Sequence, residues 1–103
     1  MTYRVIIEPT ADRGIREAFR GITENRSPAA AIKWYNALEK KVQTLKSHPH
    51  RCPIAAENDK FPEEIRELLH GPRRQKYRII FTVRQDAVHV IYVRHGAQDE
   101  IEP

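Results

Sequence analysis

The sequence predicts an α+β fold, in which one mainly antiparallel sheet carries helices on one face. Two runs rich in β-branched residues, 77–83 and 88–93, flank a short polar turn near residues 84–87 and indicate a β-hairpin. Two stretches with helical spacing of apolar residues precede them. An isolated hairpin is only marginally stable in water, so the helices must cover one of its faces. With 103 residues, we expect one domain over residues 1–103.

A first strand and a first helix are predicted near the N-terminus. Residues 3–7 form a short β-branched run, and Pro9 is expected to close it. Thr10 or Asp12 can cap the helix that follows. Its apolar stripe consists of Ile15, Ala18, Phe19 and Ile22, which fall at positions i, i+3, i+4 and i+7.

A second helix is predicted from Pro28 to about Lys46. The Ser27 hydroxyl can accept a hydrogen bond from a free backbone N–H group, and proline suits the first helical position. One face of this helix carries Ala31, Trp34, Tyr35, Leu38, Val42 and Leu45. Pro49 excludes helical geometry for the preceding residue. The two helices are therefore expected to form an antiparallel hairpin.

Residues 47–64 contain three prolines and are predicted to form a connecting loop. Residues 63–69 are ambiguous, because Pro62 and two early glutamates indicate a helix start while the run from Ile65 to Leu69 also suits a strand. Cys52 is the only cysteine, so the chain cannot form an internal disulfide. His48 and His50 lie near it, but we expect a plain loop there, with no metal and no cofactor.

The formal net charge is +4, which favours an acidic partner. Between Arg66 and His95 the chain carries seven Arg and Lys residues against two acids. No apolar run reaches the length of a membrane span, and the first residues lack a signal-peptide core, so we expect a cytoplasmic protein without membrane contact.

Side chains alternate between the two faces of a strand, so the parity of its residue number, odd or even, assigns each hairpin residue to a face of the sheet. An even-length turn places Tyr77, Ile79, Phe81 and Val83 with Val88, Val90, Tyr92 and Arg94, and this apolar set is expected to meet the helices. The opposite face then holds Arg78, Ile80, Thr82, His89, Ile91, Val93 and His95. If it is open, Ile80, Ile91 and Val93 form a partly exposed patch beside Arg78, suited to an amphipathic acidic partner segment. Alternatively, the loop of residues 47–64 folds across this face.

Six short motifs are spread along almost the whole chain, at residues 3–5, 27–34, 49–57, 65–69, 77–81 and 93–99. In these motifs and their spacing, the chain resembles the RelE/ParE superfamily of bacterial toxins. The resemblance implies that residues 65–69 form the strand before the hairpin, giving an N-terminal strand, an antiparallel helical hairpin and a three-stranded antiparallel segment. It also implies the toxin of a type II toxin–antitoxin pair, held inactive by an antitoxin, with operator DNA contacted only through the antitoxin. The face opposite the helices suits this partner, so we expect the antitoxin to bind at Arg78, Ile80, Ile91 and Val93, which parity places there.

Two mechanisms occur in this superfamily. The helical hairpin, the Ser27-Pro28 helix start and the ending after His95 look closer to ParE and plasmid stabilisation proteins, which poison DNA gyrase without a known catalytic residue. The alternative is a RelE-like endoribonuclease that cuts messenger RNA on the ribosome. A third possibility is a non-toxic protein that only binds an antitoxin.

The ribonuclease alternative requires a base, an acid and cationic groups around one phosphate. The candidates are Arg66, Arg78, Arg94 and His95, with Glu64 or Glu67 as the base. Parity separates Arg94 from Arg78 and His95, which counts against a compact catalytic site. Arg73, Arg74 and Lys76 form a basic loop that could contact nucleic acid.

Overall fold

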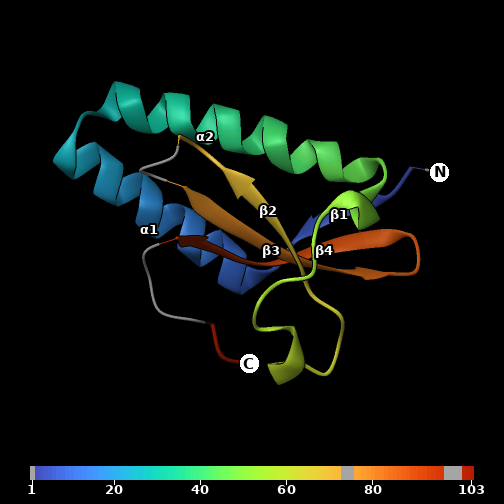
Figure 1. Cartoon of the computed structure of the whole chain (residues 1–103). Helices are drawn as coiled ribbons and strands as arrows, with labels where there is room; N and C mark the ends of the chain where they lie inside the picture. The colour runs from blue at the N-terminus through green and yellow to red at the C-terminus, as the bar shows by residue number, and fades with distance from the viewer. Residues whose placement is uncertain (1, 73–75, 97–100) are drawn as a thin grey trace.

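Four strands form one mixed sheet in the order β1-β4-β3-β2, and both long helices pack on one of its faces (Figure 1). The computed structural model describes residues 2–72, 76–96 and 101–103. The elements are β1 (Arg4–Ile7), α1 (Pro9–Asn25), α2 (Pro28–Gln43), β2 (Arg66–His70), β3 (Tyr77–Arg84) and β4 (Ala87–His95). β1 pairs with β4 in parallel, while the β4–β3 and β3–β2 pairs are antiparallel. The predicted α+β class, and the strand in place of a helix after Ile65, are confirmed.

The start of α1 differs from the sequence prediction. Pro9 opens the helix instead of closing the strand, and Glu8 occupies the N-cap in extended geometry. The Glu8 N–H group donates to the Val90 carbonyl oxygen at 2.9 Å, so the residue belongs to the sheet ladder and the helix boundary at once. Proline suits this place because its ring presets a helical φ and its missing N–H would have no helical partner. The prediction that Thr10 or Asp12 caps the helix is therefore wrong.

The start of α2 agrees with the prediction. Ser27 is the N-cap, and its hydroxyl accepts a hydrogen bond from the Ala30 N–H group at 3.0 Å. The helix ends at Gln43 and continues as a 3₁₀ turn over Thr44–Lys46. The predicted inward residues are buried or half-buried, apart from Tyr35, which is exposed and packs edge-on against Phe19 of α1.

The main core lies between the helices and the sheet. Its buried members include Ala11, Leu38, Val42, Leu45, Cys52, Ile79, Phe81, Val88, Val90 and Val93. Strand residues of this core alternate with residues of the opposite face, as the two-residue period of a strand requires. Among the described residues, no helix combines the length and apolar character that crossing a membrane requires.

A β-bulge in β4 changes the predicted faces of the hairpin. β3 and β4 pair in regular register up to Phe81 opposite Val90, and the next pair is Ile80 opposite Tyr92, so that Ile91 is the extra residue. A bulge of this kind shifts the parity of every residue beyond it. Parity therefore predicts the faces correctly up to Ile91, which packs on the face away from the helices as expected, and wrongly from Tyr92 onward.

Beyond the bulge, Val93 and His95 lie on the helix face, and Tyr92 and Arg94 lie on the opposite face. Val93 is buried with 2 % of its surface exposed, so its predicted place in an open patch is wrong. The face away from the helices is called the open face below, and its described members on β3 and β4 include Arg78, Ile80, Tyr92 and Arg94.

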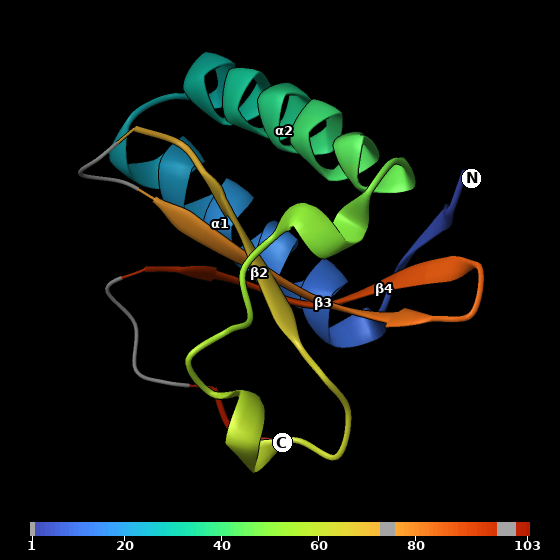
Figure 2. The same cartoon turned by 45° about the vertical axis from the view of Figure 1, so that its right-hand side comes forward.

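The open face is partly covered by the rest of the chain. A second buried cluster contains Ala55, Ile65, Ile80 and Ile101, with Phe61, Ile91 and Tyr92 packed against it. Figure 2 shows the segment between α2 and β2 crossing the sheet on the side away from the helices, with the C-terminus beside it. Ile80 has no exposed surface, so the prediction that it belongs to an exposed patch is wrong. The structure shows the alternative, in which the connecting loop folds across this face.

Candidate functional site

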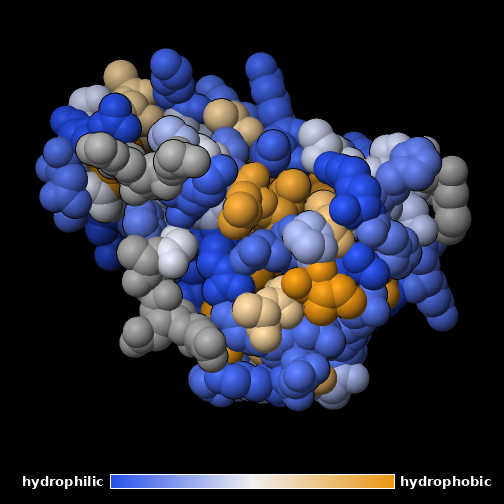
Figure 3. Space-filling model, in the orientation of Figure 1, coloured by the Kyte–Doolittle hydropathy of each residue, from blue (hydrophilic) through white to orange (hydrophobic). Residues whose placement is uncertain are grey.

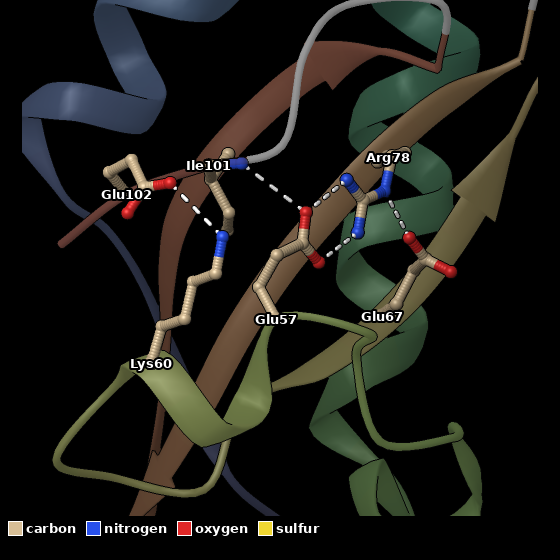
Figure 4. Close-up of polar contacts among 6 residues, drawn as sticks. All are labelled: Glu57, Lys60, Glu67, Arg78, Ile101 and Glu102. Atoms are coloured by element: carbon tan, nitrogen blue, oxygen red, sulfur yellow. Dashed lines mark hydrogen bonds and ion pairs between the residues drawn. The ribbon is translucent and has the colours of Figure 1, made fainter.

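Arg78, the second residue of β3, lies on the open face and is bound by two carboxylates (Figure 4). Its terminal nitrogens donate to both carboxylate oxygens of Glu57, at 2.7 and 2.6 Å. Its Nε donates to Glu67, which lies on the neighbouring strand β2. Every nitrogen of the guanidinium group therefore has a carboxylate partner within the chain.

This ion pair is buried. The Glu57 side chain is 1 % exposed and the Arg78 side chain 16 %. The hydrogen bonds from Arg78 lower the pKa of Glu57 to about 2, although burial alone would raise it. The same bonds raise the pKa of Arg78. Removing one partner of a buried pair leaves an uncompensated charge, so each side chain depends on the other.

The C-terminal residues lie over this ion pair. The Ile101 N–H group donates to Glu57 Oε2 at 3.3 Å, and the Ile101 side chain is completely buried. The Tyr92 hydroxyl donates to the Glu102 carbonyl oxygen at 3.0 Å. Lys60 Nζ lies 3.1 Å from Glu102 Oε1. The end of the chain is thus connected to β4 and to the 3₁₀ turn Asn58–Lys60.

Arg66 holds the connecting loop against the start of β2. Its NH1 donates to the carbonyl oxygens of Cys52 at 2.6 Å and His50 at 3.1 Å. Its Nε donates to Glu64 at 3.0 Å. Arg66 pairs with Phe81 in the ladder and so belongs to the helix face, away from Arg78. These bonds give Arg66 and Glu64 a structural role in the described chain.

The other two candidates for catalysis lie on different faces. Arg94 is opposite Arg78 in the ladder and shares the open face with it. His95 is opposite Tyr77 on the helix face, where the two rings meet edge-on with centroids 5.1 Å apart. The predicted separation of Arg94 from Arg78 is therefore wrong, and His95 is the residue that the bulge moves away.

The four candidates do not converge. Arg66 and His95 share the helix face but pair with β3 residues four positions apart, Phe81 and Tyr77, which is about 13 Å along a strand. Arg78 and Arg94 share the open face. The structure therefore brings together two of the four, and one of these two is already bound by carboxylates.

A groove that sequence reasoning missed runs between α1 and the end of β4. Its volume is about 560 Å³, and its lining includes Arg13, Arg26, Tyr77, Tyr92 and Arg94. Among the described residues, the three arginines of this groove form no ion pair. The sequence gives no local signal for it, because its lining combines α1 with the end of β4, and these elements are far apart in the chain.

Apolar side chains are also exposed beside β2. Ile54 is 46 % exposed and forms a bridge with Arg66, and Leu69 of β2 is 42 % exposed. Figure 3 shows apolar patches between polar ones on the side of the molecule that carries β2. This side therefore offers both apolar area and charge.

Metal binding finds no support in the described part of the chain, where no group of three or more His, Cys, Asp or Glu side chains could hold an ion. Cys52 is buried, and burial raises the pKa of its thiol. The predicted basic loop at Arg73 and Arg74 lies outside the described residues, as do residues 97–100 of the acidic C-terminal segment.

Comparison with known proteins agrees with this architecture. A family model described as the ParE toxin of type II toxin–antitoxin systems, parDE, matches residues 5–100. A solved structure titled as the chromosomal ParDE TA system from P. aeruginosa contains a similar chain, with a TM-score of 0.73 and 13 % identity, covering 91 % of this chain and 96 % of that one. At this identity the similarity concerns the fold. Curated proteins gave no match. Because the family model spans most of the chain, the protein belongs to the ParE toxin family of type II toxin–antitoxin systems.

Proposed function

We propose that the protein is a cytoplasmic toxin that arrests growth by poisoning DNA gyrase and is neutralised by a cognate antitoxin. Its family and its fold support a toxin role. The observation that carries the choice of a gyrase-binding toxin over a ribonuclease is the state of Arg78, whose guanidinium group is bound by Glu57 and Glu67.

A ribonuclease would need cationic groups directed at a reacting phosphate. Arg78 could reach a phosphate only by leaving Glu57, which would then be a buried carboxylate without its partner. Arg66 is bonded to carbonyl oxygens and Glu64, and His95 packs against Tyr77 on the other face of the sheet from Arg78. The arrangement favours a stable binding surface over a constellation of catalytic groups.

Antitoxin binding is proposed for the open face, where Arg78, Ile80, Ile91 and Val93 were expected to act. Ile91 is half-exposed, Arg78 is nearly covered, and Ile80 and Val93 are buried. We therefore propose that the antitoxin meets Ile91, Arg94 and the covering segment first, and that Val93 supports the surface from the helix side. Contact with operator DNA is assigned to the antitoxin.

The test is ATP-dependent supercoiling by purified DNA gyrase with and without the protein. We expect inhibited supercoiling together with linear DNA from trapped cleavage. A parallel reaction measures cleavage of messenger RNA on translating ribosomes. Unaffected gyrase and cut messenger RNA would contradict the proposal and favour the ribonuclease alternative.

A further inference from the structure

Ile101, close to the C-terminus, fills a pocket on the open face. The Ile101 side chain is fully buried among Ala55, Ile65 and Ile80, with Phe61 and Tyr92 packed around them. The pocket is formed by the connecting loop, the start of β2 and the two central strands. Its occupant is the end of the chain, beyond the last strand (Figure 1).

The polar contacts around this pocket recognise features that any extended peptide could present. Glu57 accepts a hydrogen bond from the Ile101 N–H group (Figure 4). The Tyr92 hydroxyl donates to the carbonyl oxygen of Glu102, the next residue. Lys60 pairs with the carboxylate of Glu102. The site thus accommodates an aliphatic residue followed by an acidic one.

We propose that this pocket is a peptide-recognition site, and that residues 101–103 occupy it until an extended partner segment with an aliphatic residue followed by an acidic residue displaces them. The partner is the antitoxin if the proposed function holds. The preferred peptide chemistry does not depend on who the partner is, because it rests on the contacts that Ile101 and Glu102 make.

Among the described residues, the polar contacts of residues 101–103 are those with Glu57, Tyr92 and Lys60. Glu102 and Pro103 are exposed, and the ion pair between Lys60 and Glu102 is itself exposed, with side chains 42 % and 69 % accessible. Such a pair contributes little and weakens with salt. Ile101 is therefore the main anchor, and a longer partner segment that offers the same anchor with additional contacts outcompetes it.

The site does not depend on its occupant. Glu57 remains bonded to Arg78 when Ile101 leaves, so the acceptor for the peptide N–H group stays in place. Ile80 is fixed by the strand pairing of β2 and β3, and Ile65 by backbone hydrogen bonds with Ala55 and with the Asn58 side chain. A preformed site of this kind favours exchange of one peptide for another without rearrangement of the sheet.

The test uses methyl NMR of the protein with labelled isoleucines. The probe is a synthetic octapeptide with the sequence of residues 96–103, and the control peptide carries Ile101→Asp. Both are titrated into the full chain, into its Ile101→Asp variant and into Ile32→Asp, a matched control on the exposed side of α2, where Ile32 is 54 % exposed. The Ile65 and Ile80 methyl groups report on the pocket, and the Ile101 methyl group reports on displacement.

We expect the probe to shift the Ile65 and Ile80 signals of Ile101→Asp at a midpoint about fivefold or more below that of the full chain, because no resident segment competes. In the full chain, the same probe should move the Ile101 methyl signal toward that of a free peptide. The control peptide should do neither, and Ile32→Asp should behave like the full chain.

Three results would overturn the proposal. The first is a folded Ile101→Asp protein whose Ile65 and Ile80 signals ignore the probe, with Ile101→Ala as the second variant should Ile101→Asp unfold. The second is an equal response to the control peptide. The third is a dimer of the full chain in sedimentation that Ile101→Asp dissociates, since the occupant would then be a second copy. None of these results depends on gyrase.

Discussion

Gly14 of α1 lies directly against the carbonyl oxygen of Val93 in β4. A β-carbon at position 14 would overlap with that oxygen, which belongs to the backbone and cannot move aside alone. Gly21, about two turns further along α1, has open space around it. The missing side chain of Gly14 is therefore what allows the helix to approach the sheet at this point.

Replacing Gly14 by alanine should separate α1 from β4 and lower the free energy of unfolding by about 2 kcal/mol or more, within the range of overpacking. Gly21→Ala is the matched control. It should be neutral or stabilising by up to about 1 kcal/mol, because alanine favours the helix more than glycine does. Urea denaturation measures both, and equal stability of the two variants would contradict the close approach.

The carboxylate of Glu57 should make stability depend on pH. Its pKa is lowered to about 2 by Arg78, from an ordinary value of 4.5. A lowered carboxylate pKa contributes stability that is complete above the unfolded-state value and is lost as the pH falls toward the folded-state value. The free energy of unfolding should therefore decrease between about pH 4.5 and pH 2.

The variant Glu57→Gln should remove this part of the pH dependence, since the side chain no longer titrates. Its size is about 3 kcal/mol by linkage. Glu24→Gln, which changes an exposed carboxylate on α1, serves as the control and should leave the slope unchanged. Denaturation at several pH values gives the free energy of unfolding as a function of pH for each protein. If wild type and Glu57→Gln show the same pH dependence, the ion pair contributes nothing to it.

Ser27 should stabilise the start of α2 through its hydroxyl. The variant Ser27→Ala loses the bond to the Ala30 N–H group and should cost about 1 kcal/mol. Ser27→Asp keeps an acceptor oxygen at this place and should retain most of the stability. Thermal unfolding of the three proteins measures the difference, and indistinguishable midpoints for serine and alanine would refute the role of this cap.

The Glu57–Arg78 pair should show strong coupling in a double-mutant cycle. Arg78→Met alone leaves Glu57 buried without its partner and should cost about 3–5 kcal/mol. Adding Glu57→Met removes the unpaired charge and should recover much of that loss, while Glu67 retains access to water at 21 % exposure. Urea denaturation of the two single variants and the double variant gives the coupling, and additive effects would argue against a buried pair.

Much of the fold follows from sequence periodicity. The apolar stripe of α1, the Ser27-Pro28 start of α2 and the hairpin faces up to Val90 all depend on local patterns, and the structure confirms them. The beginning of α1 is wrong because Pro9 can end a strand or begin a helix, and only the bond from Glu8 to β4 decides between the two.

The site is less predictable. The bulge at Ile91 contains neither glycine nor proline, so no residue marks it, yet it exchanges Val93 for Tyr92 on the open face. The covering of that face depends on contacts between distant residues, Glu57 with Arg78 and Ile101 with Ile80, which no local pattern reveals. The family resemblance also predicts the strand before the hairpin, observed at Arg66–His70, but it predicts none of these contacts.

The central claim is that Arg78 holds the open face together in a toxin that acts by binding. The most direct test is growth after induced expression of the folded double variant Glu57→Met/Arg78→Met, together with gyrase supercoiling in its presence. We expect this variant still to arrest growth and still to inhibit supercoiling, because the pair is structural. A folded double variant that leaves growth unaffected, while the wild-type chain cuts ribosome-bound messenger RNA, would contradict the account and identify Arg78 as a catalytic residue.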